Sequence, residues 1–364
     1  MRDLKKETNH MTETLNIKVT KATSSKLAGV DFDNLPFGKT FSDHMLTADY
    51  ADGEWKNFEI LPFGDIGLSP AISALHYGQA FFEGLKAYKH ADGKISVFRP
   101  EKNAARFNKS AERLCMPALP EEFFIQSIAA IVDMDRNWVP TKENYTLYIR
   151  PFMFATDPYL GVAPSSTYKF MVLLGPTGPY FSKNLKVKIE TEYTRASEGG
   201  FGFAKAAGNY GGSMLPAKKA MEQGFDQLIW TDAKTHEYVE EMGAANVMFV
   251  IDGKLVTPST RDTILNGVTR ESIIQLAKDF GMEVEERRVS VKEVLEAIAN
   301  GACTDAFGAG TAATIAQVAE IVHEGKTYTL PNPSESVFAV KMRKALDDIK
   351  YGRVEDVKGW NFVV

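Results

Sequence analysis

One lysine lies in an unusual setting among small residues. Lys205 stands in the stretch FAKAAGNYGGS at residues 203–213, and Tyr210 follows five residues later. Small neighbours allow a flat ligand to approach the backbone. A lysine amine that is partly removed from water can form a Schiff base with a carbonyl group. The stretch therefore predicts a nucleophilic lysine. The Tyr210 phenol could hydrogen-bond a ligand oxygen next to the imine that this lysine forms. A solvated lysine beside a glycine-rich loop is the alternative.

Two glycine-containing stretches suggest anion binding. GAGTAAT at residues 308–314 offers backbone N–H groups and the Thr311 hydroxyl to a phosphate or a carboxylate. ILNGVTRESI at residues 264–273 opens a helix, and free N–H groups at a helix start bind anions. An ordinary glycine turn is the alternative for the first stretch. An N-cap at Thr269 is the alternative for the second, and both can hold there at once.

These residues need helices and strands to position them. Apolar periodicity predicts helices at residues 102–114, 121–138, 214–223, 269–280 and 291–299. Apolar runs and turn residues predict strands at residues 85–89, 95–100, 145–154, 168–175, 185–195 and within 227–258. Because the strands and helices do not alternate regularly, we expect an α+β fold.

The stretch GPTGPYFSK, rich in proline and glycine, favours a linker between two domains. We expect a smaller N-terminal domain over residues 1–174, a linker over residues 175–185 and a larger domain over residues 186–364.

Composition restricts the class of protein. The chain has 364 residues, a net charge of −5 and two cysteines far apart in sequence. The negative charge argues against nucleic acid or an anionic membrane as the main partner. We find no CxxC or HxxH spacing and no apolar run long enough to span a bilayer, so we expect no metal site and no membrane anchor. The expected location is the cytoplasm.

Eight motifs, in order along the chain, resemble those of the branched-chain aminotransferases, which are fold type IV enzymes that depend on pyridoxal 5'-phosphate (PLP). They are FGKTFSDHM, HYGQAFFEGLKAY, VFRPEKNAARFNKSAERL, YIRPF, KAAGNYGGS, EEMGAANVMFV, LNGVTRESI and FGAGTAA. The resemblance implies a smaller N-terminal α/β domain and a larger C-terminal domain with a β-barrel-like core. It also implies a homodimer, with PLP bound between the two domains.

The resemblance implies roles for the residues around the cofactor. Lys205 matches the lysine that bonds PLP and later transfers a proton, and Tyr210 matches the tyrosine at the phenolate oxygen. Glu241, in preference to its neighbour Glu240, matches the acid beside the pyridine nitrogen. A carboxylate there keeps the ring cationic, which suits an electron sink. The phosphate site matches Arg106, Val268, Thr269 and Thr311.

The same resemblance implies the substrates. They are leucine, isoleucine and valine with 2-oxoglutarate, giving branched-chain 2-oxo acids and L-glutamate. Arg150 is the expected donor to the distal carboxylate of glutamate, with a structural ion pair as the alternative. The amides of Ala312 and Ala313 would meet the substrate α-carboxylate. The side-chain pocket matches Phe37, Phe82, Tyr148 and Tyr180, together with Tyr77 from the partner subunit.

Other functions fit less of the sequence. A PLP lyase or a D-amino-acid aminotransferase would share the fold, but the aromatic pocket and FGKTFSDHM argue against both. A phosphate-ligand binding protein does not need Lys205 together with Glu241. A dehydrogenase rests only on the G-x-G-x-x-A pattern in FGAGTAA. Ala313 and Ala316 stand where some relatives carry a CxxC pair, so we expect no thiol switch there.

Overall fold

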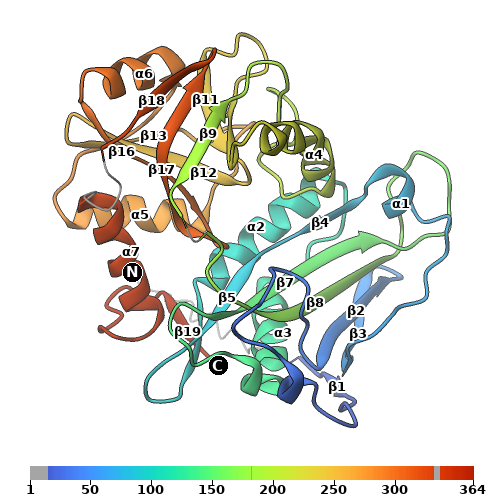
Figure 1. The fold of residues 1–364 in the computed structure, drawn as a ribbon. Helices are drawn as coiled ribbons and strands as arrows, with labels where there is room; N and C mark the ends of the chain where they lie inside the picture. Colours follow the sequence, from blue (N-terminus) through green and yellow to red (C-terminus); the bar gives the residue numbers. More distant parts are fainter. Residues whose placement is uncertain (1–14, 182, 332–336) are drawn as a thin grey trace, which may run out of the picture.

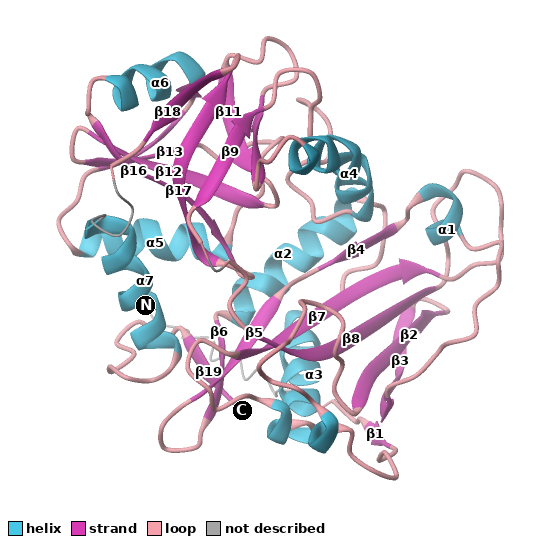
Figure 2. Ribbon diagram, viewed as in Figure 1, coloured by secondary structure: helices cyan, strands magenta, loops and turns pink. Residues whose placement is uncertain are grey.

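The strands of the computed structural model form two separate sheets (Figures 1 and 2). The structure describes residues 15–181, 183–331 and 337–364. Parts of the expected domains and linker, namely residues 1–14, Ser182 and residues 332–336, lie outside the described residues. Helices and strands are mixed in both halves of the chain, which confirms the expected α+β fold.

The first sheet is almost entirely antiparallel. Its described strands are β1 (Lys18–Val19), β2 (His44–Ala51), β3 (Glu54–Pro62), β4 (Ala80–Phe82), β5 (Leu85–Lys89), β6 (Ile95–Phe98), β7 (Thr146–Ala155), β8 (Tyr168–Thr177) and β19 (Asn361–Val363). They run in the order β1-β3-β2-β8-β7-β5-β6-β19, and β4 pairs with β7. The strands predicted at residues 85–89 and 95–100 correspond to β5 and β6, which form a hairpin in which Ala87 lies opposite Val97. β8 continues through residues 175–177 of the expected linker, and Thr177 pairs with Thr146.

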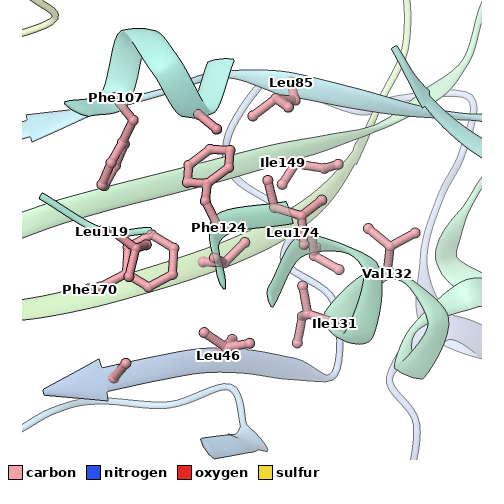
Figure 3. Close-up of a cluster of buried hydrophobic side chains, with 14 of the residues drawn as sticks. Leu46, Leu85, Phe107, Leu119, Phe124, Ile131, Val132, Ile149, Phe170 and Leu174 are labelled. Atoms are coloured by element: carbon pink, nitrogen blue, oxygen red, sulfur yellow. The ribbon is translucent and has the colours of Figure 1, made fainter. Parts of the chain in front are cut away.

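Two helices cover one face of this sheet, α2 (Pro100–Arg113) and α3 (Glu121–Met134). Figure 3 shows their apolar side chains meeting the strands: Phe107 and Phe124 lie against Phe170, with Leu46 from β2 in the same cluster. These side chains are almost fully buried, as an apolar helix stripe over a sheet requires. The helix predicted over residues 121–138 is shorter, because a separate 3-10 turn, η2 (Arg136–Trp138), follows it.

The second sheet closes on itself. Its described strands are β9 (Leu185–Ile189), β10 (Gln227–Thr231), β11 (Tyr238–Met242), β12 (Ala245–Ile251), β13 (Lys254–Pro258), β14 (Val284–Arg287), β15 (Val289–Ser290), β16 (Cys303–Gly310), β17 (Thr314–His323) and β18 (Lys326–Thr329). The order β12-β16-β17-β9-β10-β11 ends where β11 pairs again with β12, which confirms the expected barrel-like core. A turn at Asp252 and Gly253, with φ values of 48° and 75°, joins β12 to β13.

Four helices accompany the barrel, α4 (Ala207–Glu222), α5 (Val268–Asp279), α6 (Val291–Ala299) and α7 (Val337–Lys350). α6 begins after Ser290, whose hydroxyl accepts a hydrogen bond from the Glu293 amide at 3.1 Å, an ordinary N-cap. Two predicted bounds were wrong: α4 begins at Ala207 instead of Met214, and the strand after residue 185 ends at Ile189. A short helix, α1 (Ser73–Tyr77), lies in the first half of the chain.

In the described part of the chain, three further features concern membranes, metal ions and thiols. None of its helices is long and apolar enough to cross a membrane. The described side chains form no group of three or more His, Cys, Asp or Glu residues arranged to hold a metal ion. Cys115 and Cys303 are both free thiols, and burial raises the pKa of the Cys303 thiol to about 12.

Candidate active site

A cavity of about 430 Å³ lies where the two sheets meet. Its walls come from both halves of the chain: β4, β7 and α2 in the first half, and β11, α4, α5 and the turn before β17 in the second. It brings together almost every residue that the sequence predicted for the site. These are Phe37, Phe82, Arg106, Tyr148, Arg150, Tyr180, Lys205, Tyr210, Glu241, Val268, Thr269, Thr311, Ala312 and Ala313.

Lys205 is held in place by its own backbone. Its N–H donates to the Ser110 hydroxyl of α2 at 3.1 Å, and its carbonyl accepts from the Phe82 amide of β4 at 3.2 Å. The half-buried side chain points at the first turn of α4, where Nζ lies 3.0 Å from the Tyr210 hydroxyl. Nζ is also 4.9 Å from the centre of the Phe82 ring. The amine is therefore fixed by contacts with both halves of the chain, beside an aromatic wall.

Glu241 occupies another wall of the same cavity. Because side chains alternate along β11, Glu241 faces the cavity while Glu240 faces the opposite side, near Thr263. Oε1 of Glu241 accepts a hydrogen bond from the Leu265 amide at 2.7 Å. Burial raises the pKa of Glu241, against the opposing effects of Arg195 and the Leu265 amide. The carboxyl is desolvated enough for a nearby cation to change its charge state strongly.

Arg195 forms an ion pair with Glu241. Its Nε lies 3.2 Å from Oε2 of Glu241, and both side chains are more than nine-tenths buried. Its Nη2 donates to the carbonyls of Gly202 and Thr263. Arg195 therefore ties the acid to the segment that precedes Lys205. No motif in the sequence pointed to this arginine, because its partners are distant in the chain.

At another end of the cavity, the side chain of Arg106 is held by a buried acid and by a backbone carbonyl. Arg106 donates through Nε and Nη2 to the two oxygens of Glu83, at 2.7 and 2.8 Å, and through Nη1 to the Asn266 carbonyl at 3.0 Å. Glu83 is fully buried and also accepts from Asn103 at 2.8 Å. Burial would raise the pKa of Glu83, but the Arg106 guanidinium outweighs it and holds that pKa below the usual value. Glu83 was in a quoted motif but had no predicted role.

The start of α5 faces the same end. Gly267 is the N-cap residue and Val268 opens the helix, so the alternative of a Thr269 N-cap was wrong. The first N–H groups of a helix have no partner within it, and here they border the cavity. A Cβ at position 267 would lie 2.1 Å from Oδ1 of Asn246, so any side chain there would displace Asn246. Asn246 in turn donates to the Leu265 carbonyl at 2.8 Å.

The turn between β16 and β17 forms a third polar edge. Gly308 and Gly310 belong to β16 itself, so the predicted turn is confined to residues 311–313. The strand continues to Gly310 because it stays paired with both β12 and β17, and this pairing overrides the glycine signal. Lys86 of β5 donates to the Ala312 carbonyl at 2.7 Å, which joins this turn to the first sheet.

Aromatic rings line the remaining wall. The Phe37 ring lies 4.9 Å from that of Tyr148 and 5.3 Å from that of Tyr180, both edge to face. Arg150 stacks 4.5 Å above Phe82, and its Nη2 donates to the Tyr148 hydroxyl at 3.0 Å. The alternative of an ion pair finds no support, because no carboxylate of the described residues lies within ion-pair distance of Arg150. This wall is apolar, with one cation available to a ligand.

Comparison with known proteins places this geometry in a family. Residues 80–321 match the family model described as amino-transferase class IV. The chain belongs to this family. A probable branched-chain-amino-acid aminotransferase of Staphylococcus epidermidis is 46% identical over 339 residues, which cover 92% of this chain and 94% of that protein.

Solved structures agree with this class IV aminotransferase in fold. A branched-chain amino acid aminotransferase from Escherichia coli matches with a TM-score of 0.71 and 27% identity, covering 88% of this chain and 98% of that one. A branched-chain amino acid aminotransferase from T.th., complexed with N-(5'-phosphopyridoxyl)-L-glutamate, matches with a TM-score of 0.69 and 27% identity, covering 86% and 97%. The two neighbours confirm the expected fold type.

Tyr77 is the one predicted site residue of this class IV aminotransferase that lies away from its own cavity. It ends α1, is 47% exposed, and donates from its hydroxyl to the Leu160 carbonyl. Other exposed apolar side chains lie on α1 and in the loop that holds Leu160, namely Leu75, Tyr159 and Val162. A single chain therefore does not bring Tyr77 to the site.

Proposed function

We propose that this class IV aminotransferase transfers an amino group between branched-chain L-amino acids and 2-oxoglutarate, with PLP as its cofactor. The amino acids are leucine, isoleucine and valine, and the products are branched-chain 2-oxo acids and L-glutamate. The observation that carries the proposal is that Lys205 and Glu241 lie at one cavity whose remaining wall is aromatic. The names of the Staphylococcus epidermidis relative and the solved neighbours support the same substrates.

The residues of the cavity fit PLP. Lys205 would bond the cofactor aldehyde, with the Tyr210 hydroxyl 3.0 Å from the amine. Arg106, the amides that open α5 and the Thr311 hydroxyl would hold the phosphate, since together they present cationic and N–H groups to one end. Glu241 would face the ring nitrogen. PLP, when bound, supplies an electron sink that makes the substrate α-proton acidic.

Side chains of the protein then carry out the proton transfer. Lys205 is the one amine at the aromatic wall among the described residues that line the cavity, and it serves as the base and acid that moves a proton at the substrate α-carbon. Tyr210 orients this amine through their hydrogen bond. The Glu241 carboxylate, fixed by Leu265 and Arg195, stabilises positive charge beside it without needing to reorganise.

The aromatic wall fits the side chains of the substrates. The rings of Phe37, Tyr148 and Tyr180 offer apolar contact to a branched side chain and exclude water around it. Glutamate must enter the same pocket with a second carboxylate. The Arg150 guanidinium is the donor for that carboxylate, since its charge is free of any acidic partner among the described residues. The amides of the 311–313 turn, which lines the cavity, would bind the α-carboxylate.

A homodimer forms part of the proposal. Tyr77 and the apolar side chains on α1 and around Leu160 are exposed in one chain, and a patch of this kind suits a covered interface. Because the Tyr77 hydroxyl bonds to the Leu160 carbonyl, both segments would reach a partner's cavity as one unit. The proposed location of the enzyme is the cytoplasm, where free cysteines such as Cys115 and Cys303 stay reduced.

A substrate panel tests the proposal. Purified enzyme with PLP is given 2-oxoglutarate and one amino acid, and L-glutamate is measured. We expect turnover with L-leucine, L-isoleucine and L-valine and none with D-alanine. Turnover of D-alanine alone, or release of pyruvate from an aminodeoxychorismate-type substrate without glutamate formation, would place the chain among other enzymes of this fold and reject the proposal.

A further inference from the structure

A buried lysine reaches from the first sheet to the edge of the cavity. Lys86 lies on β5, directly opposite Tyr148 of β7, and its side chain is 8% exposed. Nζ donates to the carbonyl of Ala312 at 2.7 Å. Ala312 lines the cavity, whereas Lys86 is not among the described residues that do so. The lysine therefore holds the 311–313 turn from the side that faces away from the cavity.

Peptide geometry gives this contact a consequence. In a trans peptide the carbonyl of one residue and the N–H of the next point in opposite directions. The described residues contain no cis peptide bond, so the Ala312 carbonyl and the Ala313 N–H are opposed. Because Lys86 draws the carbonyl away from the cavity, the Ala313 N–H is directed toward it.

We propose that Lys86 is a positioning residue for the substrate α-carboxylate: by fixing the Ala312 carbonyl, it aims the Ala313 amide at this group. The inference rests on the proposed function, because every amino acid and 2-oxo acid in that reaction carries a carboxylate at the same place. Lys86 touches the turn and not the substrate. Its effect should therefore appear in carboxylate binding, whichever side chain the substrate has.

The surroundings of Lys86 change the charge of its amine but leave the amine able to donate to Ala312. The charged groups around it come from α7, where Lys350 opposes the ammonium and Asp347 favours it. Burial, with the Lys350 charge, lowers the pKa of Lys86 to about 7. An amine retains N–H donors in both protonation states, so the bond to Ala312 persists and its strength changes with charge.

Two compounds separate carboxylate binding from general damage to the site. 4-Methylvalerate has the branched side chain and the carboxylate but no amino group. Isoamylamine has the side chain and amino group of leucine but no carboxylate. Binding of each to the PLP-loaded enzyme is measured by titration for the wild type, Lys86→Met, Lys86→Arg and a matched control, Lys89→Met, at the end of the same strand.

The expected result is selective. Lys86→Met should weaken 4-methylvalerate binding roughly tenfold, which corresponds to one hydrogen bond of moderate strength, and leave isoamylamine within twofold. KM for L-leucine should rise more than kcat falls. Lys86→Arg should recover most of the carboxylate affinity, and Lys89→Met should match the wild type.

Two results would overturn the inference. One is unchanged 4-methylvalerate binding in Lys86→Met. The other is an equal loss for both compounds that Lys86→Arg does not restore, which would make Lys86 a purely structural residue. Failure of the proposed function is distinguishable, because wild-type enzyme would then show no turnover of branched-chain amino acids, independently of any Lys86 variant.

Discussion

Glu83 and Arg106 form a bidentate ion pair: Oε1 lies 2.7 Å from Nε and Oε2 lies 2.8 Å from Nη2, with Glu83 fully buried and Arg106 largely so. This geometry turns the remaining edge of the guanidinium toward Asn266 and the end of the cavity where we propose that the phosphate of PLP binds. Glu83 does not line the cavity, but its two hydrogen bonds fix the orientation of the Arg106 guanidinium, which does line it.

The first prediction concerns this pair. Glu83→Gln should lower the free energy of unfolding by about 3 kcal/mol, because it leaves a buried guanidinium without its counter-charge. It should also weaken PLP binding at least tenfold. Urea unfolding of the cofactor-free protein and PLP titration measure the two effects. The exposed Glu112, on the same helix as Arg106, supplies the control, and Glu112→Gln should change neither value.

The second prediction concerns the amine. Lys205→Ala should reduce kcat by a factor of about 1000 or more, because the proton-transfer group is removed. It should also abolish the covalent link to PLP, so that borohydride no longer fixes cofactor to the protein, as read by mass spectrometry. Lys219→Ala, on the exposed part of α4, should keep the label. Borohydride labelling that survives in Lys205→Ala would assign the link to another lysine.

The third prediction compares adjacent acids on β11. Glu241→Gln should lower kcat roughly 100-fold, since one preorganised charge beside the reacting system is lost. Glu240→Gln should keep kcat within a few-fold, because that side chain faces away from the cavity and burial already raises its pKa. Steady-state kinetics on both variants decide the assignment. Equal losses would contradict it.

The fourth prediction tests the shared site. Tyr77→Ala and Lys205→Ala should each be nearly inactive, yet mixing the two and allowing subunits to exchange should restore activity. In a mixed dimer one cavity carries both changes and the other carries neither. Activity is measured before and after exchange, with size-exclusion chromatography as the check on assembly. A mixture that stays inactive would place Tyr77 outside the partner's site.

The fifth prediction is a pH dependence. Below its pKa of about 7 Lys86 is charged and donates strongly to Ala312, and above it the neutral amine donates weakly. The affinity for 4-methylvalerate should therefore fall as the pH rises through about 7. Lys86→Arg should flatten this part of the profile, because a guanidinium stays charged. Identical profiles for both proteins would contradict the prediction.

The sequence predicted those site residues that recur in short motifs and lie at the ends of elements. Lys205, Glu241 and Arg106 all lie at one cavity, and strand alternation explains why Glu241 faces it and Glu240 does not. The supporting partners were not predictable in this way. Lys86 meets Ala312, and Arg195 meets Glu241, only after the two sheets have packed, and no local pattern encodes that contact.

Local propensity also misplaced the start of α4. The glycines of NYGGS disfavour a helix, so the sequence predicted a loop up to Met214. In the structure the first turn is anchored from outside: Ala206 bridges to Phe81, and the Asn209 side chain donates to the carbonyls of Phe201 and Ala204. These tertiary contacts compensate for the weak intrinsic preference and put Tyr210 on a helix facing Lys205.

The pairing of β19 with β6 has a consequence for how the protein matures. During translation, β6 emerges from the ribosome early, whereas residues 361–363 follow only after the whole barrel and α7 have been made. The β6 edge of the first sheet therefore stays unpaired until residues 361–363 have been made. An unpaired strand edge can pair with another chain, so until β19 docks this edge is open to a neighbour on the same polysome.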